Sequence, residues 1–391
     1  MAIDVERARA DTPGCENVVH LNNAGASLTP SVVVDTVVDY LRREAEMGGY
    51  ELAERSTDAI DAVYASIARL VGASPDEIAM FDGATRAWDV AFASIPFAPG
   101  DRILMSRAEY ASSVMAFLQL ARRTDVSVEV VPDDEHGQLD VGALRELLDE
   151  RVRLVAVTHV PTSSGLVNPA AAVGEAIRGS RALYLLDACQ SAGQMPLDMD
   201  AIGCHFLSAT GRKFLRAPRG TGFLYVRRDV AERTEPVFVD LRSATWVAPD
   251  RYELVPDARR FETWERNIAT MLGLGSAVDY ALAWGLDEIS ARVGAIAQGL
   301  RDRLIMIDGV TIRDLGERRC GIVTFTVDGV ETEMLADSLR AEGINVWTSH
   351  ITSSRIDFEA RGLESVVRAS PHYYNTDAEL DRLADAVAAR V

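Results

Sequence analysis

Residues 182–214 read ALYLLDACQSAGQMPLDMDAIGCHFLSATGRKF. Two short apolar runs in this stretch, ALYLLD (182–187) and HFLSA (205–209), are each followed by polar residues. Continuous apolar runs of this length are typical of strands that are covered on both faces of a parallel sheet. Such sheets bind their ligands at the carboxyl ends of the strands. The stretch therefore predicts an α/β fold in which Asp187 and the residues around Lys213 share one ligand-binding edge.

Lys213 is the only lysine among the 40 lysine and arginine residues of this 391-residue chain. Arginine replaces lysine as a cation, but it stays protonated in proteins and does not supply an amine that attacks a carbonyl. A general bias toward arginine would also leave one lysine by chance, so the neighbours of Lys213 decide whether it has a chemical role. Thr210 and Arg212 add a hydroxyl and a guanidinium to the same loop.

The other polar residues at strand ends fit one ligand. Asp187 would be costly to bury unless it met a cation, and a protonated pyridine nitrogen is a suitable partner. Gln190 is placed to bond a ring hydroxyl. Residues 82–85 (DGAT) lie between the apolar run 77–81 and a helical pattern, as in a phosphate cradle at a helix N-terminus. Taken singly, each is an ordinary turn or cap residue; together with Lys213 they predict a site for pyridoxal 5′-phosphate.

Strand and helix patterns alternate from about residue 75, which predicts a doubly wound, mostly parallel sheet. We expect a large domain at 16–262 and a smaller C-terminal α+β lobe at 263–391, with residues 1–15 belonging to the lobe. Besides the two runs quoted above, the expected strands are 77–81, 102–106, 126–131, 153–158 and 222–226 in the large domain and 321–327 in the lobe.

Composition excludes several classes of protein. A net charge of −19 and a pI near 4.8 argue against nucleic acid or anionic membrane as partner. There is no run of 18 apolar residues, and the first residues, MAIDVERARAD, do not resemble a signal peptide. We therefore expect a cytoplasmic protein with reduced thiols. The cysteines have no metal-ligand spacing, so no metal site is expected; they are Cys15, Cys189, Cys204 and Cys320.

Six segments resemble fold-type I pyridoxal-phosphate enzymes of the class V aminotransferase family, over nearly the whole chain. They are HLNNAGASLTP (20–30), DGATRAWD (82–89), THVPTSSGLVNP (158–169), LLDACQSAGQMPLD (185–198), SATGRKF (208–214) and VRASPHYYNTDAELDRL (367–383). The resemblance implies that Lys213 and Asp187 are catalytic. The cofactor-binding residues it implies are Lys213, Asp187, Gln190, Gly83, Ala84, Thr85, Thr162, Thr210, Arg212, Trp88 and Tyr110.

The resemblance also implies individual roles. Lys213 would hold the cofactor aldehyde covalently, and Asp187 would face the pyridinium nitrogen. Arg368, with Asn23 and Ala24, would bind the substrate, because a guanidinium fork suits a planar carboxylate. The position that often carries a ring-stacking histidine falls at residues 109–111. Tyr110 or Trp88 would then cover the ring, although either also suits a packed core.

Three departures narrow the function. Cysteine desulfurases of this group carry a nucleophilic cysteine on the loop that matches 347–356, which here reads WTSHITSSRI. Arg212 stands where a histidine usually precedes the lysine. Trp264 and Glu265 replace a Gly-Thr pair that reaches the partner subunit's phosphate. These variants resemble a subgroup with the ergothioneine-forming C–S lyase, isopenicillin N epimerase-like proteins and enzymes of cysteine S-conjugates in lincosamide pathways.

The sequence thus predicts a homodimeric pyridoxal-phosphate-dependent C–S β-lyase. Its substrate would be a cysteine S-conjugate, and its products pyruvate, ammonia and a thiol or sulfenate. An aminotransferase, an epimerase and a decarboxylating deaminase remain open, because the reaction depends on which Cα bond stands perpendicular to the ring. A catalytically silent binding protein is disfavoured because Lys213, Asp187 and Gln190 are all present. A nicotinamide enzyme is disfavoured because no G-x-G-x-x-G follows the first strand.

Overall fold

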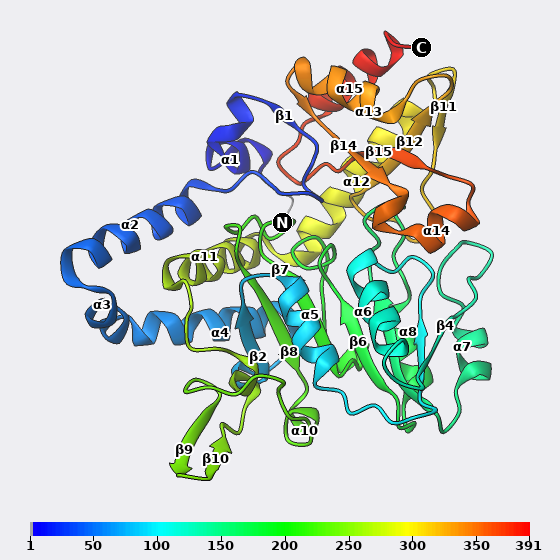
Figure 1. Ribbon diagram of the computed structural model, residues 1–391. Helices are drawn as coiled ribbons and strands as arrows, with labels where there is room; N and C mark the ends of the chain where they lie inside the picture. The colour runs from blue at the N-terminus through cyan, green and yellow to red at the C-terminus, as the bar shows by residue number, and fades with distance from the viewer. Residues whose placement is uncertain (1–2) are drawn as a thin grey trace.

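The computed structural model describes residues 3–391, and a seven-stranded sheet forms its centre (Figure 1). Its strands are β2 (Ile78–Phe81), β3 (Arg102–Met105), β4 (Ser127–Val130), β5 (Val152–Thr158), β6 (Leu183–Asp187), β7 (Phe206–Thr210) and β8 (Gly222–Val226). The order across the sheet is β2-β8-β7-β6-β5-β3-β4. β8 runs in the opposite direction to the other six strands of this sheet. The predicted sheet is confirmed, and each strand matches its predicted range to within one residue at either end.

Both faces of this sheet are buried, because successive strand residues point to opposite sides. Leu185 belongs to the core on one face and Leu186 to the core on the other. Trp88 and Phe92 of α5 pack on the same side as Leu185. The helices that connect the strands are α5 (Ala84–Ala93), α6 (Ala111–Ala121), α7 (Val141–Leu147), α8 (Ala170–Ile177), α9 (Met199–Ile202) and α10 (Arg228–Ala231). The doubly wound architecture explains the continuous apolar runs in the strands.

A second, antiparallel sheet forms a smaller lobe, drawn in yellow to red at the top of Figure 1. Its order is β11-β12-β15-β14. Its strands are β11 (Val310–Ile312), β12 (Val323–Val327), β14 (Trp347–His350) and β15 (Ser365–Ala369). The helices of this part of the chain are α12 (Leu286–Leu304), α13 (Thr332–Ala341), α14 (Arg355–Ala360) and α15 (Asp377–Ala388). The predicted α+β lobe is confirmed.

The N-terminal part of the chain connects the two sheets. The short strand β1 (Val19–His20) pairs in parallel with β13 (Ile344–Asn345), beside the small lobe. The helices that follow extend away from it at the left of Figure 1. Helices of this part are α1 (Val5–Ala10), α2 (Ser31–Met47), α3 (Gly49–Arg55) and α4 (Thr57–Val71). Along the whole described chain, short 3-10 helices occur at Pro13–Glu16, Pro75–Glu77, Ala258–Phe261 and Ile351–Ser353.

The expected domain boundary at residue 262 stays a prediction, and the packing bears on where it lies. Helix α11 (Ile268–Trp284) contacts α2 and α4, and its Met271 and Leu274 belong to the core of the large sheet. The core of the small lobe begins with Ile296 on α12 and also takes in Val19 and Leu21. Residues 1 and 2 of the expected segment 1–15 lie outside the described residues.

A hairpin of β9 (Ala244–Ala248) and β10 (Arg251–Leu254) projects from the large domain at the lower left of Figure 1. Large apolar side chains on the hairpin and beside it are exposed: Val237, Phe238, Leu241, Trp246, Tyr252 and Trp264. None of the helices described over residues 3–391 is both long enough and apolar enough to cross a membrane.

Candidate active site

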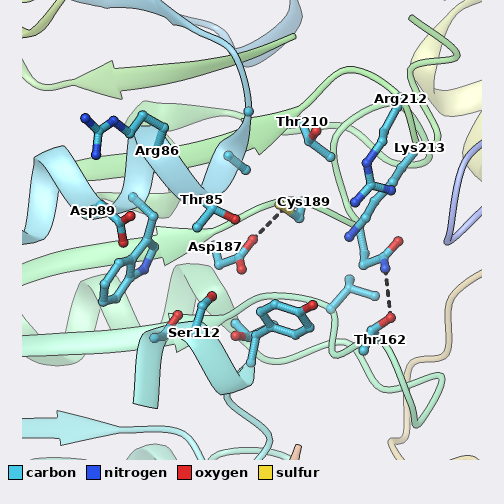
Figure 2. Close-up of a pocket in the computed structure, with 18 of the residues that line it drawn as sticks. Thr85, Arg86, Asp89, Ser112, Thr162, Asp187, Cys189, Thr210, Arg212 and Lys213 are labelled. Atoms are coloured by element: carbon cyan, nitrogen blue, oxygen red, sulfur yellow. Dashed lines mark hydrogen bonds between the residues drawn. The ribbon is translucent and has the colours of Figure 1, made fainter. Parts of the chain in front are cut away.

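The carboxyl ends of β2, β5, β6 and β7 meet at one edge of the large sheet and surround a cavity of about 430 Å³. The residues that follow these strands supply most of its walls (Figure 2). All eleven residues predicted to bind the cofactor line this cavity. Their individual roles stay predictions, but the structure brings them together from segments that are more than 100 residues apart in sequence.

The N-terminus of α5 lies at one wall of the cavity, where its first backbone N–H groups are suited to bind an anion. Its N-cap, Gly83, makes no side-chain capping bond, so the first backbone N–H groups of the helix have no partner from a capping side chain. Gly222 closes this loop from behind, since a Cβ there would lie 2.7 Å from the carbonyl carbon of Gly83 and 2.9 Å from the nitrogen of Ala84. Thr85 and Thr210 add hydroxyl groups to the same wall.

Asp187 and Lys213 lie close enough to act on each other's charge. The backbone N–H of Cys189 donates to Asp187 Oδ1 at 2.8 Å and fixes the carboxylate at the end of β6. Burial lowers the pKa of Lys213 below its ordinary value, and the positive charges of Arg212 and Arg368 act in the same direction. Asp187 partly opposes this shift. A lysine whose pKa is lowered is a better nucleophile and base near neutral pH.

Gln190 presents an unpaired acceptor to the cavity. Its Nε2 donates to the Ala24 carbonyl and to Thr162 Oγ1, both at 3.1 Å. Its Oε1 is buried and has no hydrogen-bond partner in the structure. A buried amide oxygen without a partner is rare in folded proteins and is expected to meet a donor on a ligand. A ring hydroxyl next to Gln190 and Thr162 would supply that donor.

Arg368, on β15, brings the small lobe to the cavity edge. Its Nη1 donates to Thr162 Oγ1 and its Nη2 to Asn22 Oδ1 at 3.1 Å, while Nε has no partner. Burial, reinforced by the charge of Arg212, lowers the pKa of Arg368 to about 10. Among the residues that the structure describes, no carboxylate forms an ion pair with it. The guanidinium therefore retains donor capacity for an anion.

The residues next to Arg368 differ from the sequence prediction in one respect. Asn23 was expected near the substrate, but its side chain bonds the Ser370 carbonyl and the hydroxyl of Tyr374. Asn22, one residue earlier, contacts Arg368 instead. The sequence offers the pair Asn22-Asn23 without showing which side chain faces inward. Ala24 contributes only its backbone, as the acceptor for Gln190.

The two aromatic candidates for covering the ring are held differently. Trp88 stacks on Phe92 with ring centroids 5.0 Å apart and lies 5.4 Å from Phe117, so the apolar core holds its indole. Tyr110 precedes α6 and is 42% exposed while lining the cavity. Its ring is the freer of the two to lie over a bound cofactor, and this assignment stays a prediction.

Two supporting residues escaped the sequence reasoning. Glu109 is buried beneath the cavity and accepts bonds from Ser106 Oγ, from Thr158 Oγ1 and from the Thr158 N–H. Ser354 lines the cavity, and its Oγ donates to the Glu109 carbonyl at 3.2 Å, which ties the small lobe to the large one. Burial raises the pKa of Glu109 to about 7, and the negative charge of Asp187 adds to this effect.

The raised pKa of Glu109 predicts a pH-dependent stability. Its ordinary value is 4.5, so between about pH 4.5 and 7 the folded protein keeps a proton that the unfolded chain releases. Stability is therefore lost as the pH rises through this window. Glutamine resembles the protonated acid and does not titrate. As the pH rises from about 4.5 to 7.5, the free energy of unfolding of Glu109→Gln should therefore increase by about 3 kcal/mol relative to that of the unmodified protein. Urea unfolding at the two pH values measures this difference. If the free energy of unfolding changed equally with pH in both proteins, Glu109 would be ionised in the folded state.

The donor set fits pyridoxal 5′-phosphate on structural grounds. An anion cradle, an unpaired buried acceptor, a carboxylate and an amine of lowered pKa line one cavity. The cradle would hold the phosphate, Asp187 the protonated ring nitrogen, and Gln190 with Thr162 the ring hydroxyl. Lys213 would carry the aldehyde. When bound there, the cofactor supplies a cationic ring that accepts electrons from the substrate.

Comparisons with known proteins agree with this fit. The family model for Aminotransferase class-V matches residues 19–383. A probable cysteine desulfurase of Methanothermobacter thermautotrophicus is 31% identical over 388 residues, which cover 97% of this chain and 96% of that protein. The apo structure of a cysteine desulfurase from Thermococcus onnurineus aligns with a TM-score of 0.92 and 25% identity, over 100% of this chain and 98% of that one.

A third similar structure is the complex of a cystine C–S lyase with its reaction product, cysteine persulfide. It aligns with a TM-score of 0.87 at 22% identity, over 96% of this chain and 99% of that one, and at this identity it shows the fold alone. The family model spans both sheets and every residue of the cavity discussed above. The chain therefore belongs to the class V aminotransferase family and is a pyridoxal-phosphate-dependent enzyme.

Proposed function

We propose that this protein is a C–S β-lyase that acts on a cysteine S-conjugate. The observation that carries the proposal is the loop 347–356, which reaches the cavity with Ser354 and contains no thiol. An enzyme that transfers sulfur to its own cysteine needs a thiol at such a place. A lyase does not, because the sulfur leaves with the rest of the conjugate.

The overall reaction consumes the conjugate and one water. The bond between Cβ and sulfur breaks, the sulfur leaves with its electron pair as a thiolate or sulfenate, and hydrolysis gives pyruvate and ammonia. Lys213 Nζ would take the proton from Cα, and burial, which lowers its pKa, favours the neutral amine that this step needs. Arg368 would hold the substrate carboxylate and so orient the Cα–H bond toward Lys213. Bound at this site, the cofactor would supply the electron sink, and Asp187 would hold a proton on its ring nitrogen.

The main rival is a cysteine desulfurase, the activity that names several relatives. It would need a reactive thiol, and Cys189 does line the cavity. Burial and the neighbouring Asp187 raise the pKa of Cys189 well above its ordinary range, which keeps it protonated and a poor nucleophile. The remaining cysteines are buried: Cys15, Cys204 and Cys320. The name of the cystine C–S lyase supports the lyase reaction within this fold.

Product analysis tests the proposal. Free cysteine and a panel of S-substituted cysteines should differ, with pyruvate and ammonia formed in equal amounts from the conjugates and no alanine from either. Cys189→Ser should keep pyruvate formation, because no step uses its thiol. Rapid alanine formation with a persulfide on Cys189 would instead establish a desulfurase. An aldehyde or an oxo acid that retains the sulfur would identify a decarboxylating deaminase or an aminotransferase, and inversion at Cα an epimerase.

The expected homodimer stays a prediction. The exposed apolar residues on and beside the β9–β10 hairpin give a second copy a surface to cover. A second, smaller cavity lies between this surface and the active site: Phe238 lines it, and Arg86 and Gly220 line both cavities. A second copy placed on the hairpin would therefore lie close to the active-site entrance.

A further inference from the structure

Arg212, from the loop after β7, and Arg368, from β15 of the small lobe, bond to one short turn. Arg212 Nη1 donates to the carbonyl of Gly25, and Arg368 Nη2 donates to Asn22 Oδ1 at 3.1 Å. Asn22 and Gly25 are the two ends of a tight turn, closed by the Gly25 N–H to the Asn22 carbonyl at 3.0 Å. A Cβ on Gly25 would stand 2.6 Å from Asn22 Oδ1, so the two ends are in contact. The turn therefore holds the two guanidinium groups close together.

No acid neutralises this pair within residues 3–391. Neither Arg212 nor Arg368 forms an ion pair, and each contacts only neutral oxygens. Arg368 is 5% exposed and Arg212 is half-buried. Two like charges taken out of water repel each other and lose hydration, which is unfavourable unless anions arrive. The positive charge of Arg212 adds to burial in lowering the pKa of Arg368, as expected of two cations that bond the same turn.

The bond to Gly25 places Arg212 on the same side of the cavity as Arg368, the residue predicted to bind the substrate carboxylate. Figure 2 shows Arg212 beside Lys213, at the end of the cavity that contains Thr162, while Arg86 lies at the opposite end. Arg212 lines the cavity directly, whereas Arg368 stands behind Thr162. The phosphate cradle at Gly83 already has backbone and hydroxyl donors of its own. Apart from the Nη1 bond to Gly25, the Arg212 guanidinium bonds no other group among the described residues, so its remaining donors can reach an anion in the cavity.

We propose that Arg212 binds a second anionic group of the substrate, so that the enzyme prefers amino acids with an acidic side group over neutral ones. Arg368 would take the α-carboxylate and Arg212 a carboxylate or sulfonate carried beyond the sulfur. This inference rests on the proposed amino-acid site and adds the chemical class of the conjugate. Together the two anions would neutralise the two guanidinium groups on the Asn22–Gly25 turn.

A matched pair of substrates tests the preference without any mutation. S-carboxymethyl-L-cysteine and S-carbamoylmethyl-L-cysteine have nearly the same shape and differ by one charge. The holoenzyme should show a KM about 10- to 100-fold lower for the acid, as expected of a charge-assisted bond to guanidinium. Equal KM values for the two conjugates would overturn the proposal.

Three variants test whether Arg212 itself contacts the acidic group. Arg212→Gln should raise the KM of the acid about 10- to 100-fold and change that of the amide by less than about threefold. Arg212→Lys keeps the charge but not the planar fork of donors, so its KM for the acid should lie between those of the unmodified enzyme and Arg212→Gln. Arg219→Gln removes the same charge from an exposed position on the same loop and should change both conjugates little and equally. If Arg219→Gln raised the KM of the acid as much as Arg212→Gln, the preference would come from the overall positive charge of the loop and not from a contact with Arg212.

Two further outcomes would also overturn the proposal. If Arg212→Gln weakened the acid and the amide equally, Arg212 would share the α-carboxylate with Arg368. If it loosened the cofactor in an equilibrium titration without changing the preference, Arg212 would bind the phosphate.

Ligands without a β-leaving group separate a failure of the lyase proposal from a failure of the acidic preference. L-glutamate and L-glutamine, titrated into the holoenzyme and followed by the cofactor absorbance, should show the same preference for the acid even if no pyruvate is ever formed. Pyruvate formed from both conjugates with equal KM would support the lyase and reject the acidic preference.

Discussion

Lys213→Ala is expected to lose turnover by about three orders of magnitude or more, and Lys213→Arg is expected not to restore it. The reason is chemical, because only a neutral amine forms a covalent bond with the cofactor aldehyde and takes a proton from Cα. The cavity lowers the pKa of this amine, chiefly through burial. Steady-state rates with the best conjugate of the panel measure the loss, and the absorbance of the purified protein shows whether cofactor is still held.

The sequence itself provides the control for this experiment. Lys213 is the only lysine in the chain, so borohydride reduction should leave a single modified lysine peptide, the one that contains residues 208–214. Both variants should lack that adduct while still binding the cofactor noncovalently through the α5 cradle. A colourless unmodified protein without a reducible adduct would contradict the cofactor assignment. Turnover retained by Lys213→Arg would contradict the role of the amine.

The residues at the strand ends were predictable because burial on both faces leaves a direct mark on the sequence. A strand such as β6 contains only apolar residues until it reaches the edge, where Asp187 appears. The order of strands is not encoded in this way, yet parallel strands place their carboxyl ends at one edge whatever the order. This is why the phosphate loop, Asp187 and Lys213 were expected together before the sheet order was known.

The residues that were missed depend on packing across long stretches of chain. Glu109 is buried only because β3 and β5 are neighbours, which gives it Thr158 as a donor. Ser354 reaches Glu109 from the other lobe, 245 positions later in the sequence. Asn22 and Asn23 are adjacent, but Asn22 bonds Arg368 on β15 whereas Asn23 bonds the Ser370 carbonyl and the Tyr374 hydroxyl. No periodicity or local motif carries this information.

The position of the boundary between the two domains also depends on packing that no local sequence pattern encodes. The expected boundary at residue 262 assigns the segment from Asn267 onward to the small lobe. Helix α11 instead packs against α2 and α4, on the large-sheet side. It is buried around most of its circumference, since Ala269, Met271 and Ala277 project from different sides of the helix and all three are buried. A helix buried on several sides has no single apolar face that would show which domain it joins.

Asp187→Asn is expected to lower turnover by about two orders of magnitude or more, with a smaller effect on substrate affinity. Asparagine keeps the shape of the side chain, and its Oδ1 would still accept the Cys189 N–H that fixes Asp187 at the end of β6. What it loses is the negative charge that is predicted to stabilise a proton on the ring nitrogen. A ring without that proton withdraws electrons less strongly, so loss of the Cα proton becomes harder. The change should therefore appear in kcat more than in KM.

The charge and the position of Asp187 are separated by a second variant. Asp187→Glu keeps the negative charge on a side chain one methylene longer, so it should retain more activity than Asp187→Asn although it moves the carboxylate. Cofactor affinity should fall in Asp187→Asn, because the predicted ion pair to the ring would be lost while the predicted phosphate cradle at Gly83 would stay intact. Equilibrium titration of the apoprotein with pyridoxal phosphate measures this. Unchanged kinetics and an unchanged spectrum in Asp187→Asn would mean that the carboxylate only ends the strand, and the electron sink would then depend on another group in the cavity.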